Sequence, residues 1–242
     1  MSDERPDILI LLAAGSARRM QGMVEDKVCA PLAGKPAFLH SLAAFAAAGT
    51  VGKVIVAHRD EPQRRRMQEL LDIHGQGLGV DAWVLGGGER QDSVLAALEA
   101  AGAGNPLVHI HDGARPLITP EAIRLVRARA LDSGAAILAS RSADTVKLAR
   151  PGTATVESSP DRHLVWAAET PQVFRLELVR DAYRRARQDA RRVTDDSSAV
   201  SLAGHEVILV ENPDPNLKVT RPSDLAVAEA ILRSRAPREG AQ

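Results

Sequence analysis

Residues 8–27 read ILILLAAGSARRMQGMVEDK, and this stretch indicates both the fold and the kind of ligand. An apolar run typical of a buried strand leads into small residues at 13–15, then into arginines that include Arg19, and finally to Lys27. Small side chains let backbone N–H groups approach an oligophosphate, and the cations that follow can neutralise its charge. The stretch therefore predicts a nucleotide triphosphate site at a strand end. A tight turn with solvated arginines is the alternative for the turn alone.

The composition bounds the class of protein. The 242 residues are 45% hydrophobic and only 2% aromatic, which suits one compact α/β domain over residues 1–242 with an aliphatic core. Lys plus Arg equals Asp plus Glu at 31 each, so the bulk charge argues against a nucleic-acid partner. The single cysteine, Cys29, excludes an intrachain disulfide and favours a cytoplasmic location. No apolar run approaches the roughly 20 residues of a membrane span, and no targeting signal is visible.

Strand-length apolar runs alternate with helical patterns along the chain. The predicted strands are residues 8–13, 54–57, 82–85, 107–111, 135–139 and 207–210, and the predicted helices are residues 36–48, 119–130, 176–188, 197–202 and 225–233. This βαβ order predicts a Rossmann-like, mainly parallel twisted sheet with helices on both faces. Its ligand crevice is expected at the carboxyl ends of the strands. The segment after Ala236 is predicted to be disordered.

The alternation breaks between about residues 141 and 168. Short segments follow one another there, interrupted by prolines and a glycine, at residues 144–147, 153–157 and 163–167. They predict a protruding β-arm with its own hairpin. A hairpin that lacks a core is marginal in water, so the arm is expected to pack on a second subunit. A mobile surface loop is the alternative.

Two further motifs follow predicted strands. In GGGERQDSV, residues 86–94, glycines precede a helix, so that bare backbone can lie against a flat base while Ser93 adds a hydroxyl. In HDGARP, residues 111–116, Asp112 at a strand end can hold Mg²⁺ or a ribose hydroxyl, or it can cap a turn. The standard P-loop and GxGxxG patterns are absent, which disfavours a redox Rossmann protein.

Taken together, the motifs resemble those of 2-C-methyl-D-erythritol 4-phosphate cytidylyltransferases. The matching segments occur in the family's order and span nearly the whole chain: LAAGSARRM with Lys27, GGGERQDSV, HDGARP, ADTVK, ETPQVF, VTDDSSAV and NLKVTRPSDLAVAE. Four residues depart from the pattern, and one extra residue stands between Arg19 and Lys27. Gly88 stands where many relatives have aspartate, Ala17 replaces a usual glycine, Asp26 replaces a proline before Lys27, and Asn212 replaces a common glycine.

The resemblance implies a reaction of non-mevalonate isoprenoid synthesis. The phosphate of methylerythritol phosphate would attack the α-phosphorus of CTP, giving a CDP-alcohol and pyrophosphate with Mg²⁺ as cofactor. Catalysis would come from positioning and charge neutralisation. The family pattern also implies a homodimer in which the arm carries Arg162 into the neighbouring site.

The resemblance assigns three groups of residues. The catalytic cations would be Arg19, Lys27, Arg162 and Lys218. The nucleotide would contact Ala13, Ala14, Gly15, Gly87, Gly88, Ser93, Asp112 and Gly113, with Asp112 also beside the metal. The acceptor would lie near Arg115, Thr145, Thr170 and Thr194.

Two alternatives stay open. A sister cytidylyltransferase that uses ribitol 5-phosphate or another pentitol phosphate would share nearly every motif. A catalytically silent nucleotide-binding homologue would keep the fold, but the joint presence of Arg19, Lys27, Asp112, Arg162 and Lys218 argues against it.

Overall fold

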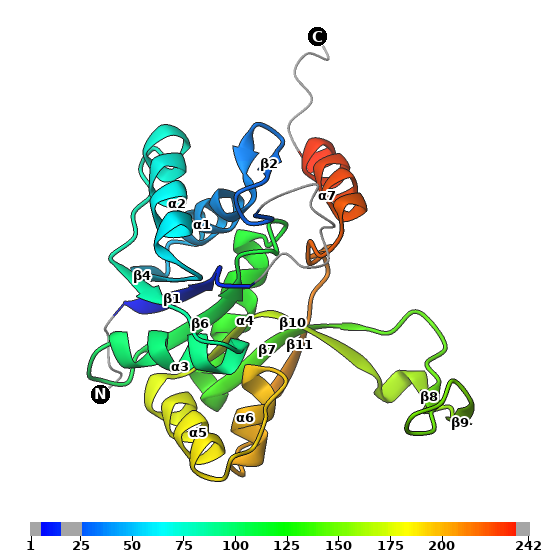
Figure 1. Ribbon diagram of the computed structural model, residues 1–242. Coiled ribbons are helices and arrows are strands. Elements are labelled where there is room, and N and C mark those ends of the chain that lie inside the picture. Colours follow the sequence, from blue (N-terminus) through cyan, green and yellow to red (C-terminus); the bar gives the residue numbers. More distant parts are fainter. Residues whose placement is uncertain (1–5, 16–25, 236–242) are drawn as a thin grey trace.

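A seven-stranded sheet forms the centre of the computed structural model, which describes residues 6–15 and 26–235 (Figure 1). The strand order is β11-β7-β10-β6-β1-β4-β5. The strands are β1 (Asp7–Leu12), β4 (Val51–His58), β5 (Ala82–Leu85), β6 (Leu107–Asp112), β7 (Ala135–Arg141), β10 (Trp166–Arg175) and β11 (Ile208–Glu211). Strand β10 runs antiparallel to β6 and β7, and the other neighbours pair in parallel. The predicted mainly parallel α/β sheet is confirmed.

Helices cover both faces of the sheet, as the sequence predicted. Because side chains alternate along a strand, Leu9 and Leu11 of β1 pack with one set of helices, and Ile8 and Ile10 pack with the other. The first set is α1 (Ala37–Ala48), α2 (Glu61–His74) and α4 (Pro120–Ser133). The second is α3 (Arg90–Ala100), α5 (Leu176–Gln188) and α6 (Asp196–Leu202). Helix α7 (Pro222–Arg235) packs beside the short hairpin of β2 (Pro31–Leu32) and β3 (Lys35–Pro36).

Capping side chains fix where two of these helices begin. The Thr119 hydroxyl accepts a hydrogen bond from the Ala122 amide at 3.2 Å, and Pro120 occupies the first turn of α4. The Asp60 carboxylate does the same for α2, accepting from the Gln63 amide at 2.8 Å. The α2 cap follows β4 directly, so it also fixes the chain at the carboxyl edge of the sheet.

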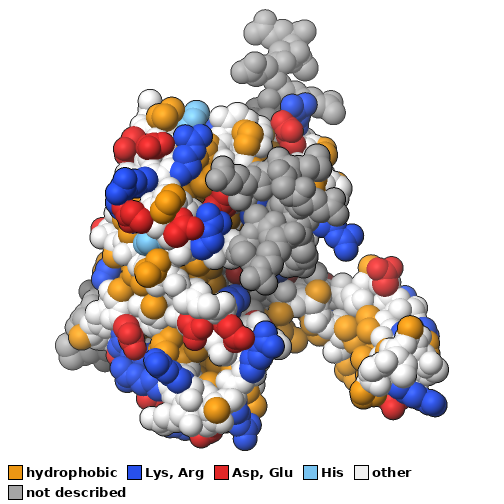
Figure 2. Space-filling view, viewed as in Figure 1, with side chains coloured by type: hydrophobic (Ala, Val, Ile, Leu, Met, Phe, Trp, Pro, Cys, Tyr) orange, Lys and Arg blue, Asp and Glu red, His pale blue; other side chains and the backbone are white. Residues whose placement is uncertain are grey.

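An arm projects from the body between β7 and β10 (Figure 1). It carries the antiparallel pair β8 (Leu148–Ala149) and β9 (Val156–Ser158), followed by the 3₁₀ turn η2 (Arg162–Leu164). Hydrophobic side chains lie open on it (Figure 2), and the Leu164 side chain is 80% exposed. The predicted hairpin is present, but its strands are shorter than expected.

Several sequence predictions need correction or lie outside the described residues. Residues 144–147 form a bend and irregular chain, so the predicted first arm segment is wrong, and pairing begins only at Leu148. Strand β10 was not predicted, although it lies inside the main sheet. Arg19 and the segment after Ala236 fall outside the described ranges. Among the described helices, none is long and apolar enough to cross a membrane.

Candidate functional site

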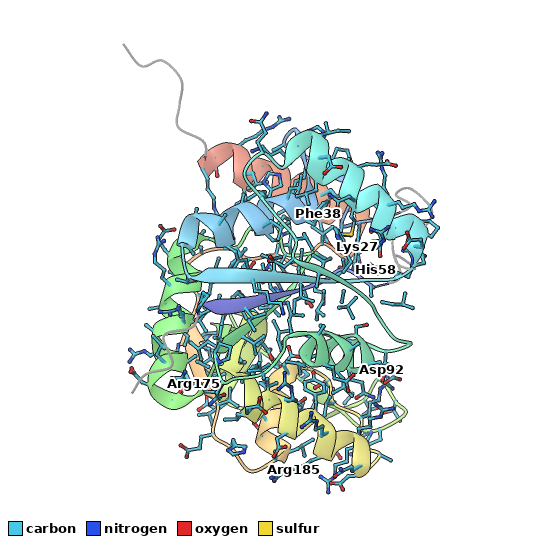
Figure 3. All side chains as sticks on the ribbon, turned by 90° about the vertical axis from the view of Figure 1, so that its left-hand side faces the viewer. Lys27, Phe38, His58, Asp92, Arg175 and Arg185 are labelled. Carbon is cyan, nitrogen blue, oxygen red and sulfur yellow. The ribbon has the colours of Figure 1, made fainter. Side chains whose placement is uncertain are left out.

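A pocket of about 440 Å³ opens at the carboxyl edge of the sheet, where the fold predicts a ligand crevice. It is lined by residues from six parts of the sequence: Leu12, Ala13, Ala14, Gly15, Lys27, Val28, Arg59, Gly87, Gly88, Glu89, Arg90, Ser93, Asp112, Ala114 and Lys218. The turn of residues 13–15 after β1, the glycine turn of residues 86–88 and the HDGARP segment therefore converge, as predicted. Lys27 and Asp92, which come from different segments, lie toward the same side of the molecule (Figure 3).

The first wall of the pocket is the turn that follows β1. The Ala13 amide donates to the Ala57 carbonyl at 2.8 Å, which extends the β1–β4 pairing to the start of the turn. Gly86 packs against this turn from the other side. A Cβ atom there would lie 2.5 Å from the Ala14 Cβ and 2.7 Å from the Ser93 Oγ. Glycine is thus required at Gly86 by close approach of the two loops.

The second wall is the glycine turn before α3. The Ser93 hydroxyl accepts a hydrogen bond from the Gly87 amide at 3.1 Å, so Ser93 fixes the turn as well as lining the pocket. A Cβ atom at Gly87 would lie 2.2 Å from the Asp92 Cβ, so this position too has no room for a side chain. At Gly88 the nearest atom is the Asp92 Oδ2 at 4.0 Å. The structure therefore offers space for a side chain at Gly88, the position that departs from the family pattern.

Asp112 at the end of β6 is surrounded by cations. Its Oδ2 lies 2.6 Å from the Lys218 Nζ and 3.9 Å from the Arg115 Nε, and its Oδ1 lies 3.5 Å from the Arg90 Nε. Burial alone would raise the pKa of Asp112, but the charges of Lys218 and Arg90 outweigh it and hold the pKa well below its usual value. Asp112 is therefore ionised at any working pH. Its side chain pairs with cations and does not cap a turn, which was the alternative interpretation.

Lys218 reaches the pocket because its segment is bonded to the HDGARP loop. The Val219 amide donates to the Ala114 carbonyl at 2.8 Å, and the Arg115 Nη1 donates to the Asn216 carbonyl at 2.7 Å. These bonds join the NLKVT segment to the end of β6. The predicted neighbours Lys218, Arg115 and Asp112 are thus brought together.

A buried ion pair fixes Arg90 at the start of α3. Its two Nη groups donate to the carboxylate of Asp196 at 2.8 and 2.7 Å, and the Tyr183 hydroxyl donates to the same carboxylate at 2.6 Å. The Asp196 side chain is 0% exposed. Burial, with the adjacent Asp196 charge, raises the pKa of Tyr183 well above its usual value, so its hydroxyl stays a donor. Sequence reasoning missed this pair because nothing in the local pattern links α3 to α6.

Thr170 and His111 support the backbone of Asp112. The Thr170 Oγ1 accepts from the Asp112 amide at 3.1 Å and lies 3.1 Å from the His111 Nδ1. The His111 Nε2 lies 3.2 Å from the Arg115 carbonyl oxygen. Burial lowers the pKa of His111 to about 4, so the imidazole is neutral near pH 7. His111 has a structural position, as expected, and Thr170 lies beside the site.

Among the described residues, the other predicted site residues are not part of the pocket lining. Gly113 adjoins the pocket, where its amide donates to the Leu12 carbonyl at 2.9 Å. Thr145 and Arg162 are exposed on the arm, apart from the pocket lining of their own chain. Thr194 is exposed before α6, and its amide donates to the Ser198 hydroxyl at 3.2 Å. Within one chain, the pocket therefore lacks Thr145, Thr194 and Arg162.

Comparison with known proteins gives a consistent match. A family model described as 2-C-methyl-D-erythritol 4-phosphate cytidylyltransferase matches residues 8–234. The chain belongs to this cytidylyltransferase family. A relative of that name from Syntrophotalea carbinolica is 38% identical over 93% of this chain and 95% of its own length. Another from Pelotomaculum thermopropionicum is 40% identical over 93% of this chain and 94% of its own.

Solved structures agree with the family assignment. The crystal structure of 2-C-methyl-D-erythritol 4-phosphate cytidylyltransferase from Thermus thermophilus matches with a TM-score of 0.73 at 30% identity. The match covers 93% of this chain and 98% of that one. The fold of this cytidylyltransferase is thus the fold of a solved member of its family.

A carboxylate in this cytidylyltransferase that sequence reasoning missed is Glu169, which is buried beside the site. Its Oε2 accepts from the Asn212 Nδ2 at 2.8 Å and from the Asn216 Nδ2 at 3.0 Å. The Asn216 Nδ2 also donates to the Thr170 carbonyl at 2.9 Å. Asn212, a departure from the family pattern without meaning in the sequence alone, is therefore a partner of a buried carboxylate that links β10 to the Lys218 segment.

Proposed function

We propose that the chain transfers the cytidylyl group of CTP to 2-C-methyl-D-erythritol 4-phosphate, and that the pocket at the carboxyl edge of the sheet is where this occurs. Relatives over almost the whole chain carry this activity in their names. The observation that carries the proposal is the meeting of Lys27, Arg90 and Lys218 around one pocket with Asp112. None of those relatives is named for a pentitol phosphate, so that alternative is not favoured.

The reaction needs charge neutralisation more than acid–base chemistry. A phosphate oxygen of the acceptor forms a bond to the α-phosphorus of CTP, the bond from that phosphorus to the bridging oxygen breaks, and pyrophosphate leaves. Both reactants are anions, so cations at their junction lower repulsion and stabilise the charge that builds on the phosphoryl oxygens. In this scheme Lys27 and Arg19 neutralise the triphosphate, and Lys218 lies where the acceptor phosphate meets the nucleotide.

The nucleotide is read mainly by backbone. Ala13, Ala14 and Gly15 on one side and Gly87 and Gly88 on the other line the pocket with small residues, so a base and its phosphates can approach the main chain closely. Gly113 and Ser93 complete this group, Ser93 by fixing the glycine turn.

Asp112 suits a magnesium ion that is held largely by phosphate oxygens. Mg²⁺ is commonly bound by one or two carboxylates together with substrate phosphates and waters. Asp112 lines the pocket as a carboxylate, and within residues 6–15 and 26–235 there is no group of three acidic, histidine or cysteine side chains that could hold a metal without substrate. When bound, the ion would polarise the phosphoryl oxygens. Asp112 would give it one oxygen ligand.

The acceptor lies on the Lys218 side of the pocket in this proposal. Arg115 and Thr170 are close to Asp112 there, and Thr194 precedes α6 in the chain. A homodimer would supply the rest, with Arg162 and Thr145 on the arm of one subunit reaching the site of its partner. The arm's exposed Leu148, Val156 and Leu164 side chains support this use. Residues 1–242 act as one nucleotidyltransferase domain, which works in the cytoplasm.

A substrate grid tests the proposal. Pyrophosphate release is measured with CTP, UTP, ATP and GTP, each against methylerythritol phosphate and ribitol 5-phosphate, with Mg²⁺ or with a chelator. We expect turnover with CTP and methylerythritol phosphate that is at least tenfold faster than any other pair and is lost with the chelator. Equal or faster turnover with ribitol phosphate would show that methylerythritol phosphate is not the preferred acceptor. An absence of pyrophosphate release from every pair would refute the activity.

A further inference from the structure

Arg59 is a cation of the pocket that no sequence motif identified. It follows His58, the last residue of β4, and lines the pocket together with Lys27 and the glycine turn. His58 and Lys27 lie at the same side of the molecule (Figure 3). The Arg59 side chain is 33% exposed. It is thus placed at the carboxyl edge of the sheet with part of its side chain open to solvent.

A buried amide fixes the backbone of Arg59 relative to the triphosphate turn. The Gln63 Oε1 accepts from the Arg59 amide at 2.6 Å, and the Gln63 Nε2 donates to the Ala13 carbonyl at 3.0 Å. The same Nε2 also donates to the carboxylate of Asp26, next to Lys27. Gln63 is 3% exposed. The Arg59 backbone therefore holds a set position relative to Ala13 and Asp26, and these bonds do not involve its side chain.

The Arg59 guanidinium interacts only weakly with its two carboxylate neighbours, Asp26 and Asp60. Its Nη1 lies 3.6 Å from the Asp26 Oδ2, beyond hydrogen-bond distance, and Asp26 already accepts from Gln63 and from the Val28 amide at 3.1 Å. Its Nε donates to the Asp60 Oδ2 at 2.7 Å, but that carboxylate is 43% exposed, and exposed ion pairs contribute little. A triphosphate carries more charge than either carboxylate, and guanidinium binds phosphate through two parallel bonds.

We propose that Arg59 is a further phosphate-binding residue of this enzyme, whose guanidinium moves from Asp26 and Asp60 to the phosphate oxygens when the nucleotide enters the pocket. This inference rests on the proposed function, because it assigns Arg59 to the CTP side of that site. Asp26 and Asp60 hold the guanidinium at the pocket wall in the free enzyme. Arg59 therefore acts in nucleotide affinity more than in acceptor binding.

The test compares Arg59→Gln with the matched control Arg64→Gln. Arg64 lies on α2, where it pairs with Glu61 at 2.6 Å, and it is absent from the pocket lining. Calorimetric titration with CTP and Mg²⁺, and separately with cytidine, gives the dissociation constants. We expect Arg59→Gln to weaken CTP about tenfold, the effect of a lost charged hydrogen bond. Cytidine binding and the KM for methylerythritol phosphate should stay within about twofold, and Arg64→Gln should match the wild type.

Arg59→Lys provides the second variant. A lysine keeps the charge but not the two-bond geometry, so CTP binding should weaken about threefold, between wild type and Arg59→Gln. Unchanged CTP binding in both variants would overturn the proposal, as would an equal loss for cytidine and CTP, which would indicate a structural role. Failure of the wild type to bind CTP at all would instead count against the proposed function. The two failures are therefore distinguishable.

Discussion

The Nζ of Lys218 lies 2.6 Å from the Oδ2 of Asp112, although the two residues come from opposite halves of the chain. Arg90 and Arg115 stand on the other sides of the same carboxylate. One negative charge thus holds several positive charges at the pocket in the absence of substrate. When anionic reactants enter, these cations are already collected, so little reorganisation is needed.

Replacing Lys218 should impair the use of the acceptor. We expect Lys218→Ala to lower kcat/KM for methylerythritol phosphate about a hundredfold, or roughly 3 kcal/mol of transition-state stabilisation, with a smaller change in the KM for CTP. Steady-state kinetics with each substrate varied in turn would measure this. Lys35→Ala, an exposed lysine on β3, is the control and should behave as wild type. An unchanged kcat/KM in Lys218→Ala would show that Lys218 does not contribute to acceptor binding or catalysis.

Replacing either triphosphate cation should reduce turnover itself. Lys27→Ala and Arg19→Ala are each expected to lower kcat about a hundredfold or more, since a lost preorganised contact to the transition state typically costs roughly 3 to 4 kcal/mol. Lys27 lines the pocket, and Arg19 lies outside the described residues. The measurement is kcat at saturating CTP and acceptor. Turnover near the wild-type value in both variants would refute their assignment.

A shared site predicts complementation between inactive subunits. In the proposed homodimer the arm of each chain serves its partner's pocket, so Arg162→Ala should remove activity. Mixing Arg162→Ala with Lys27→Ala subunits should restore part of the activity, since a mixed dimer contains one pocket with both residues. The assay is pyrophosphate release after subunit exchange has been verified by mass spectrometry. No recovery in verified mixed dimers would count against the shared site.

Buried His111 predicts a loss of stability in mild acid. Its pKa is about 4 in the folded chain and 6.5 ordinarily, so between these values the unfolded state binds the extra proton and stability falls as the pH falls. From pH 7 to pH 5 this amounts to about 2 kcal/mol. The depressed pKa of Asp112 adds its own loss only at lower pH, below its ordinary value of 3.8.

Urea unfolding at pH 7 and pH 5 would check this effect. The free energy of unfolding of His111→Gln should fall by about 2 kcal/mol less than that of the wild type between the two values. His74→Gln, at the exposed end of α2, should follow the wild type. Identical pH dependence in His111→Gln and wild type would show that the imidazole does not titrate as its burial implies.

The sequence predicted most of the sheet because its strands are continuous apolar runs. Strand β5 and helix α5 have the predicted bounds, and the other predicted elements of the main body differ only at their ends. Strand β10 escaped prediction because its middle is polar, with Glu169, Thr170 and Gln172, and because the β7 pairing shifts register between Ala168 and Gln172. Its polar groups are satisfied by distant partners, such as Asp195 for Gln172 at 2.8 Å.

The pocket residues also fall into those that the sequence reveals and those that only the structure reveals. Residues within local motifs, such as Lys27, Gly87 and Asp112, could be found because glycines and charges near strand ends are visible in sequence. Partners that meet only in three dimensions could not be found. The position of the Arg59 backbone depends on Gln63, and the position of the Arg90 side chain depends on the buried carboxylate of Asp196 in α6.

The most direct test of the central claim is a crystal structure of the protein with methylerythritol phosphate and a CTP analogue whose α,β-bridge is methylene. The account predicts cytosine between residues 13–15 and the glycine turn, phosphates within hydrogen-bond distance of Lys27 and Arg59, and the acceptor phosphate beside Lys218. A nucleotide bound outside this pocket, or an acceptor phosphate far from Lys218 in every site of the assembly, would contradict it.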